Sequence, residues 1–112
     1  MKPKTNKWLQ KTYEALNNQF FDGRLKLRPS KVRFASWDEL DDDGMYLVGD
    51  SLLVNEDFKT HETMCVIVLL HEMVHVDQNQ GGYVGYTDDS HDLIFHAGID
   101  RLYRAGAYET LL

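Results

Sequence analysis

The chain has 112 residues, of which 43% are hydrophobic and 12% aromatic, and its formal net charge is −6. This length suits one domain spanning residues 1–112 and excludes a second. The single cysteine excludes an internal disulfide and a cysteine-based zinc ribbon. Because no apolar run reaches the ~20 residues of a membrane span and no signal-type region follows the basic N-terminus, we expect a soluble, intracellular (cytoplasmic) protein with no membrane partner.

Charge is unevenly distributed along the sequence. Nine of the 12 basic residues precede residue 34, in one group at the N-terminus and a second from Arg24 to Arg33. The overall acidic balance argues against tight non-specific binding of nucleic acid by the bulk surface. The local groups are compatible with a contact surface and, more simply, with a solvated face.

The first third of the chain predicts a helix and then a strand. Apolar residues recur at helical spacing across residues 5–21, and Asp22-Gly23 supplies a stop signal. Residues 31–35 alternate between apolar and polar side chains, as in a strand with one covered face.

The next segment predicts a hairpin. After a polar, acidic connection over residues 38–44 come two short apolar runs, 45–48 and 51–54. Only Gly49-Asp50 separates them, and this pair is a two-residue hairpin turn signal. Together with the preceding strand, the hairpin predicts a small antiparallel three-stranded sheet.

The second half of the chain predicts two helices and therefore an α+β fold. The first spans about residues 60–78, with Thr60 as a plausible N-cap. A polar, glycine-containing loop follows over residues 78–89, and the last helix runs from about Ser90 to Arg104. No linker or repeat suggests a second module.

The most informative stretch is His71-Glu72-Met73-Val74-His75, an H-E-x-x-H sequence within a strongly apolar helix. Two residues four apart lie on one face of a helix, so both imidazoles can reach one metal ion. A helix that is apolar on nearly all sides is buried, and buried polar groups need partners. The pattern predicts a Zn²⁺ ion held by His71 and His75, with Glu72 as general base.

A catalytic zinc ion usually has three protein ligands, and the metzincin continuation of the motif is absent. His91 lies one turn before Phe95 on the apolar stripe of the last helix, so we expect His91 to be the third ligand. His96 lies ~140° away around the helix axis, and we interpret it as a surface or partly buried histidine. His96 remains the alternative ligand, and Asp92 and Glu109 are weaker candidates.

Three further residues are candidates for supporting roles. Tyr83 and Tyr86, in the loop between the two ligand helices, are possible stabilisers of an oxyanion. Asp77 follows the second histidine closely and is a candidate to orient a ligand imidazole. The acidic run at residues 41–43 lacks the spacing of a calcium loop and predicts a solvated turn.

Four segments, in this order, resemble the SprT-like (Spartan-like) metalloprotease domain over about residues 8–104. Residues 13–25 are similar to the family's N-terminal helix and its Asn…Phe-x-Gly-x-Leu ending. The strand and hairpin region and the H-E-x-x-H helix follow, and residues 90–95 are similar to a Gly-His-Gly-x-x-Phe segment. The chain departs from the last pattern at Ser90 and Asp92, where the family has glycine.

The resemblance implies a minimal zincin-like domain whose C-terminal helix carries the third zinc ligand, His91. It implies a zinc-dependent endopeptidase acting on a protein or peptide substrate. Spartan-type members act on proteins crosslinked to DNA, so DNA association is also implied, although the net charge of −6 argues against it. The alternative is a catalytically weak or inactive zinc-binding protein that serves as a binding or inhibitory module.

Overall fold

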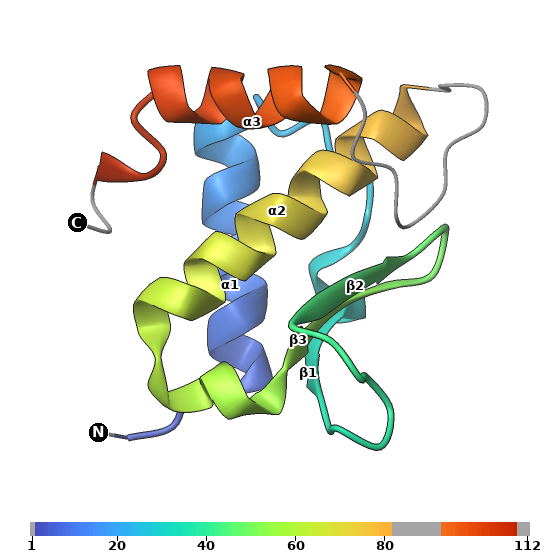
Figure 1. Ribbon diagram of the computed structural model, residues 1–112, viewed down its shortest axis with the longest axis vertical. Coiled ribbons are helices and arrows are strands. Elements are labelled where there is room, and N and C mark those ends of the chain that lie inside the picture. Colours follow the sequence, from blue (N-terminus) through green and yellow to red (C-terminus); the bar gives the residue numbers. More distant parts are fainter. Residues whose placement is uncertain (1, 82–92, 110–112) are drawn as a thin grey trace.

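The computed structural model describes residues 2–81 and 93–109, which form an α+β domain of three helices and a three-stranded mixed sheet (Figure 1). Within these ranges, no helix combines the length and apolar character needed to cross a membrane. The elements in chain order are α1 (Asn6–Phe20), the 3₁₀ turn η1 (Pro29–Lys31), β1 (Val32–Ala35), β2 (Gly44–Leu47), β3 (Ser51–Asn55), the 3₁₀ turn η2 (Glu56–Thr60), α2 (Glu62–Gln80) and α3 (Leu93–Arg104).

The N-terminal helix α1 confirms the amphipathic pattern of the sequence. Thr5 caps its first turn, accepting a hydrogen bond from the Trp8 backbone N–H at 3.1 Å. Leu9 and Tyr13 are buried on its inner face. The helix ends where the stop signal predicts, because Asp22 and Gly23 both adopt positive φ angles, of 54° and 70°.

The sheet differs from the antiparallel arrangement that the sequence predicts. Its strand order is β1-β3-β2, and β1 pairs parallel to β3 while β2 pairs antiparallel to β3. Every residue of β3 is buried, whereas three of the four β2 residues are only partly buried. A strand that is covered on both faces is stabilised most at the centre of a sheet. The more apolar hairpin strand therefore lies between the other two, and β2 becomes an edge strand.

The hairpin itself is confirmed, with one correction. Leu47 pairs with Ser51, so three residues form the loop and not the predicted Gly49-Asp50 pair alone. The Asp50 N–H donates to the Leu47 carbonyl at 2.8 Å, and Gly49 has a φ of 73°. Glycine supplies that backbone conformation without the steric cost of a side chain.

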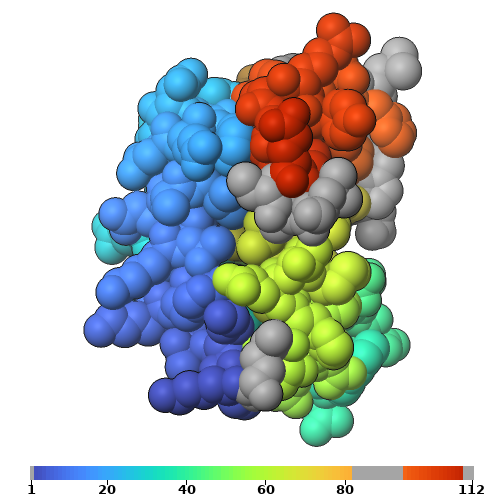
Figure 2. All heavy atoms as spheres, turned by 90° about the vertical axis from the view of Figure 1, so that its left-hand side faces the viewer, coloured from blue at the N-terminus to red at the C-terminus, as the bar shows by residue number. Residues whose placement is uncertain are grey.

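Two apolar clusters lie on opposite faces of the sheet. On the larger side, α1 contacts β1 and α2 contacts β2, and their side chains form one core with both strands and β3. Figure 2 shows the blue α1 beside the first turns of α2, in yellow-green, with α3 above them. The smaller cluster contains Ala35, Leu40 and Leu53, so the loop between β1 and β2 covers the other face through Leu40.

The motif helix α2 is buried along most of its length, as its apolar sequence predicts. It begins at Glu62, and Thr60 is the last residue of η2, so the predicted Thr60 cap is wrong. The preceding residue, His61, is exposed and makes no side-chain capping bond. The 3₁₀ turn takes up Thr60, and the helix begins and ends two residues later than predicted.

The last helix, α3, crosses α2 (Figure 1) and presents its apolar stripe inward. Phe95 and Leu102 are buried, and both belong to the predicted stripe. A methyl group at Gly98 would lie 2.8 Å from Val74 Cγ1. Glycine therefore permits the close approach of the two helices next to the motif.

Candidate metal centre

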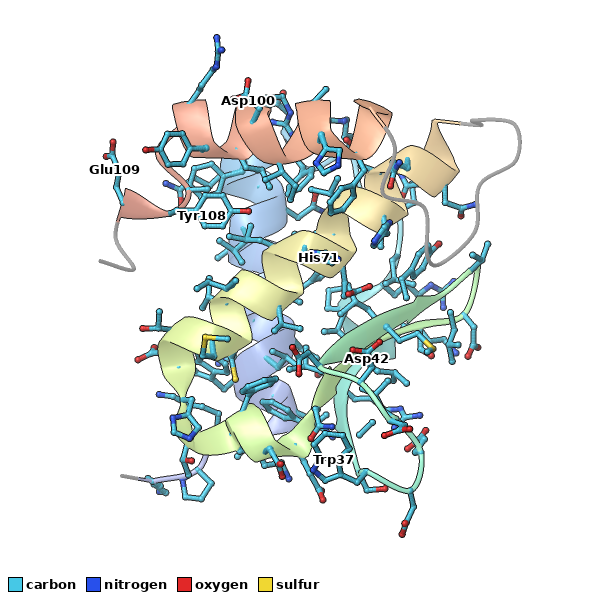
Figure 3. All side chains as sticks on the ribbon, in the orientation of Figure 1. Trp37, Asp42, His71, Asp100, Tyr108 and Glu109 are labelled. Atoms are coloured by element: carbon cyan, nitrogen blue, oxygen red, sulfur yellow. The ribbon has the colours of Figure 1, made fainter. Side chains whose placement is uncertain are left out.

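A hollow of about 320 Å³ opens between α2 and the edge strand β2. We call it the histidine cleft. Figure 3 places His71 in the middle of α2 and Asp42 on the loop that leads into β2. The α2 wall comprises Met64, Ile67, Val68, His71, Glu72 and His75, and the opposite wall comprises Asp42, Asp43, Gly44 and Met45.

All three functional residues of the H-E-x-x-H motif line this cleft. The rings of His71 and His75 meet edge to face, with their centroids 5.1 Å apart. His75 is 1% exposed and Glu72 is 6% exposed, whereas the His71 side chain is 38% exposed. His71 Nε2 lies 3.9 Å from Glu72 Oε2. The helix thus brings two imidazoles and a buried carboxylate to one opening, as its spacing predicts.

The buried amide of Gln78 fixes the protonation of His75. His75 Nδ1 lies 3.0 Å from Gln78 Oε1, and both residues are buried. An amide oxygen only accepts hydrogen bonds, so Nδ1 carries the proton in this contact. In the neutral ring the lone pair is then on Nε2, which is the form that binds a metal ion. This histidine therefore fits a zinc ligand.

Phe95 holds both histidine rings from the side of α3. Its ring stacks on His75 with a centroid distance of 4.6 Å and an interplanar angle of 22°. It also lies 4.8 Å from the His71 ring. Aromatic contacts of this kind restrict ring orientation as well as burying area. The α3 stripe therefore supports the motif, although sequence reasoning treated Phe95 only as core.

Gly44 allows the edge strand to lie close to the motif helix. A methyl group at this position would lie 2.5 Å from Val68 Cγ1 and 3.3 Å from Glu72 Cγ. The first of these distances is too short for a real contact, so any side chain here would displace the helix wall. The absence of a side chain at Gly44 therefore helps to set the position of the Glu72 stem.

Asp42 and Asp43 form one edge of the cleft, which we call the acidic lip. Asn55, at the end of β3, holds this lip in place. The Asn55 amide donates to the carbonyls of Leu40, at 3.3 Å, and Asp42, at 3.0 Å. Its backbone N–H donates to the Asp43 carbonyl at 2.8 Å. Asn55 is 1% exposed, so these bonds lie in a low-dielectric setting. The loop predicted as a solvated turn is exposed, but a buried anchor positions it beside the motif.

The predicted third ligand cannot be placed among the described residues. Within 2–81 and 93–109, no three His, Cys, Asp or Glu side chains are grouped so as to hold a metal ion. The predicted ligand His91 lies outside these ranges, and so do Tyr83 and Tyr86. His96 is exposed, in agreement with its interpretation as a surface histidine. Glu109 is also exposed and lies in the segment that follows α3 (Figure 3).

The role suggested for Asp77 is wrong. Its two carboxylate oxygens accept hydrogen bonds from Arg24, at 3.3 Å from Nε and 2.9 Å from Nη2. The carboxylate thus joins the end of α2 to the segment after α1, while the neighbouring Gln78 contacts the imidazole. Gln78 lies three residues after His75, so the two side chains share one face of the helix. A polar side chain at that spacing in an apolar helix was the sequence feature that could have indicated Gln78 as the partner of the imidazole.

The single cysteine has no place in this site. Cys65 is buried, and its thiol donates to the Phe58 carbonyl at a sulfur–oxygen distance of 2.8 Å. Burial raises the pKa of the Cys65 thiol to about 11. The thiolate, which is the nucleophilic and metal-binding form, is therefore scarce at neutral pH. Cys65 is a core residue, as the sequence predicts.

Comparison with protein-family models, with curated proteins and with solved structures finds no match to this chain in any of the three. The case for its function therefore depends on the motif and on the geometry of the histidine cleft.

Proposed function

We propose that this chain is a zinc-dependent endopeptidase of the SprT-like type. The observation that carries the proposal is the histidine cleft, in which His71, His75 and the buried Glu72 face one opening beside an edge strand. His71 and His75 would hold the ion, with His91 as the third ligand by resemblance. Zn²⁺, when bound, supplies Lewis acidity that polarises a scissile carbonyl and lowers the pKa of the attacking water.

Glu72 performs the proton transfers in this proposal. It accepts a proton from the attacking water and delivers it to the nitrogen of the leaving amine as the peptide bond breaks. Glu72 is 6% exposed and lines the cleft, so it would meet substrate in a setting with little competing water. Tyr83 or Tyr86 remains the proposed stabiliser of the oxyanion.

The edge strand β2 supports a polypeptide as substrate. Its residues Gly44 and Met45 line the cleft opposite the motif. An extended peptide can add to the edge of a sheet through main-chain hydrogen bonds, which recognise a chain without requiring one sequence. Exposed apolar side chains of α2, Met64 and Ile67, would contact alternate side chains of such a peptide. This arrangement favours an unfolded segment of a protein over a small molecule.

A matched pair of substitutions on α2 tests the proposal. Glu72→Gln removes the general base, whereas Glu62→Gln makes the same chemical change at an exposed position in the first turn. Each protein is loaded with zinc, its metal content is measured by mass spectrometry, and cleavage of fluorescently labelled β-casein is followed on gels. We expect Glu72→Gln to lose about 10²–10⁴-fold in rate while retaining zinc, and Glu62→Gln to match the wild type.

The same experiment separates the alternative function. A wild-type protein that binds one zinc ion but does not cleave β-casein or itself would indicate a binding or inhibitory module. Undiminished cleavage by Glu72→Gln would remove the catalytic role of the carboxylate. Absence of zinc from protein purified without chelator would contradict both functions.

A further inference from the structure

A second hollow, of about 340 Å³, lies at the end of α2 near the β2–β3 turn. We call it the basic hollow. It is separate from the histidine cleft, since the two share no lining residue. Three segments surround it: the stretch before β1, the end of β2 with its turn, and the last two residues of α2. The lining residues are Lys26, Leu27, Arg28, Lys31, Tyr46, Gly49, Asp50, Asn79 and Gln80.

Hydrogen bonds inside the protein use the amide oxygens that line this hollow. Asn79 Oδ1 accepts from the Tyr46 hydroxyl at 2.9 Å. Gln80 Oε1 accepts from the Lys26 backbone N–H, and Gln80 Nε2 donates to the Arg24 carbonyl at 3.0 Å. The Asn79 amide nitrogen is a donor that none of these bonds uses. The scaffold thus keeps its acceptors occupied and leaves donors for a ligand.

The cations of this segment fall into two classes. Arg24 and Arg33, at its two ends, are paired with Asp77 and Glu39. Lys26, Arg28 and Lys31, between them, are exposed and line the hollow, and within the part of the chain that the structure describes they form no ion pair. Within the stretch from Arg24 to Arg33, the positive charge left without a carboxylate partner therefore lies at the hollow, in a chain whose net charge is −6.

We propose that the basic hollow binds a phosphate group, either as free phosphate or as part of a soluble phosphate ester. The donors reach it from two segments: two ammonium groups and a planar guanidinium come from the stretch before β1, and one amide comes from the end of α2. A tetrahedral anion with several oxygens accepts hydrogen bonds from several directions at once, whereas a carboxylate offers two oxygens in one plane. The one acidic side chain in the lining, Asp50, accepts from the Ser51 hydroxyl at 3.0 Å and opposes the anion.

Two single substitutions change the charge of the hollow with little change in shape. Asn79→Asp keeps an oxygen to accept from Tyr46 and replaces the donor nitrogen with a negative oxygen. Asp50→Asn removes the opposing charge and keeps an acceptor for Ser51. Titration of zinc-loaded protein with inorganic phosphate, by calorimetry at low ionic strength, is expected to show binding that Asn79→Asp weakens about tenfold or more and Asp50→Asn strengthens about threefold.

A pair of double variants separates a built site from diffuse attraction. Lys26→Gln/Lys31→Gln removes two charges from the hollow, and Lys7→Gln/Lys11→Gln removes two exposed charges from α1. We expect the double substitution in the hollow to weaken phosphate binding at least fivefold more than the double substitution on α1. Equal losses in the two variants would overturn the proposal, and so would binding that Asn79→Asp leaves unchanged.

A titration with adenosine 5′-monophosphate distinguishes the two sources of the group. Affinity equal to that of inorganic phosphate indicates that the hollow recognises phosphate alone. Tighter binding that is equally sensitive to Asn79→Asp indicates a phosphate ester as the ligand. Absence of binding by either compound at millimolar concentration would rule the site out.

Discussion

The histidine cleft and the basic hollow use the same two elements, β2 and α2, in opposite ways. In the cleft two of the three motif residues, Glu72 and His75, are buried, and His75 is held by Gln78 on one side and Phe95 on the other. In the hollow the buried contacts belong to the scaffold, and the charged groups are long exposed side chains above it. The first arrangement suits the proposed reaction centre, because its groups are held in place before a substrate binds, whereas the proposed phosphate site relies mainly on mobile exposed charges.

This difference predicts that substitutions in the cleft have large, specific effects on metal binding. His75→Ala is expected to lower zinc affinity by more than the ~10–100-fold typical of losing an outer partner of a metal ligand. His61→Ala, which changes an exposed histidine just before the same helix, should leave zinc affinity unchanged. Competition with a chromophoric chelator measures both. Full zinc affinity in His75→Ala would show that the motif does not hold the metal.

The next largest effect is expected at Gln78, because it contacts the proposed ligand His75. Gln78→Ala should lower zinc affinity about 10–100-fold by freeing the ring and its tautomer. Gln78→Glu retains an acceptor for Nδ1 and should restore most of the affinity. Gln80→Ala changes the last residue of α2, which lines the basic hollow, and serves as the control. A Gln78→Ala protein with wild-type zinc affinity would limit this residue to packing.

Two glycines near β2 are constrained for different reasons. Gly44, at its start, lacks room for a side chain, whereas Gly49, in the turn after it, has a positive φ angle. Gly44→Ala should lower the free energy of unfolding by about 1–3 kcal/mol, because its methyl group would collide with Val68. At Gly49 a methyl group meets no atom within 4 Å, but the φ of 73° strains alanine by about 1–2 kcal/mol. Urea unfolding measures both, and only Gly44→Ala should also reduce cleavage, since it displaces the wall beside Glu72.

The smallest effect is expected at the partly exposed ion pair between Arg24 and Asp77. Asp77→Asn should lower the free energy of unfolding by less than about 1 kcal/mol, as for most surface pairs. Zinc affinity should not change, since Gln78 and not Asp77 contacts the imidazole. Thermal unfolding and the chelator titration together check this. A clear loss of zinc affinity in Asp77→Asn would show that Asp77 influences the proposed metal centre although it contacts Arg24 and not the imidazole.

Much of the local structure could be predicted because it depends on residues close in sequence. The amphipathic pattern of α1 and the stop at Asp22-Gly23 are properties of neighbouring residues. The same is true of the grouping of His71, Glu72 and His75, which follows from helical spacing. The end of α3 at Arg104 and the burial of Phe95 agree with periodicity for the same reason.

The failures all involve partners distant in sequence or competition between neighbours. The parallel pairing of β1 with β3 depends on which strand is most stable at the centre of the sheet. Asp77, two residues after His75, does not face that ring and pairs with Arg24, 53 residues away, whereas Gln78, at the i+3 position, contacts His75. The anchoring of the acidic lip by Asn55 likewise requires the end of β3 to meet the loop before β2.

The spacing of two histidines and a glutamate was therefore sufficient to predict one chemical face, because a helix has a fixed period. Tertiary packing alone placed that face against Gly44 and the edge strand, and it brought the cations at Lys26, Arg28 and Lys31 to the same hollow as Asn79 and Tyr46. Short-range geometry repeats regularly along a chain. The choice among long-range partners depends on burial and charge, which emerge only when the whole core is assembled.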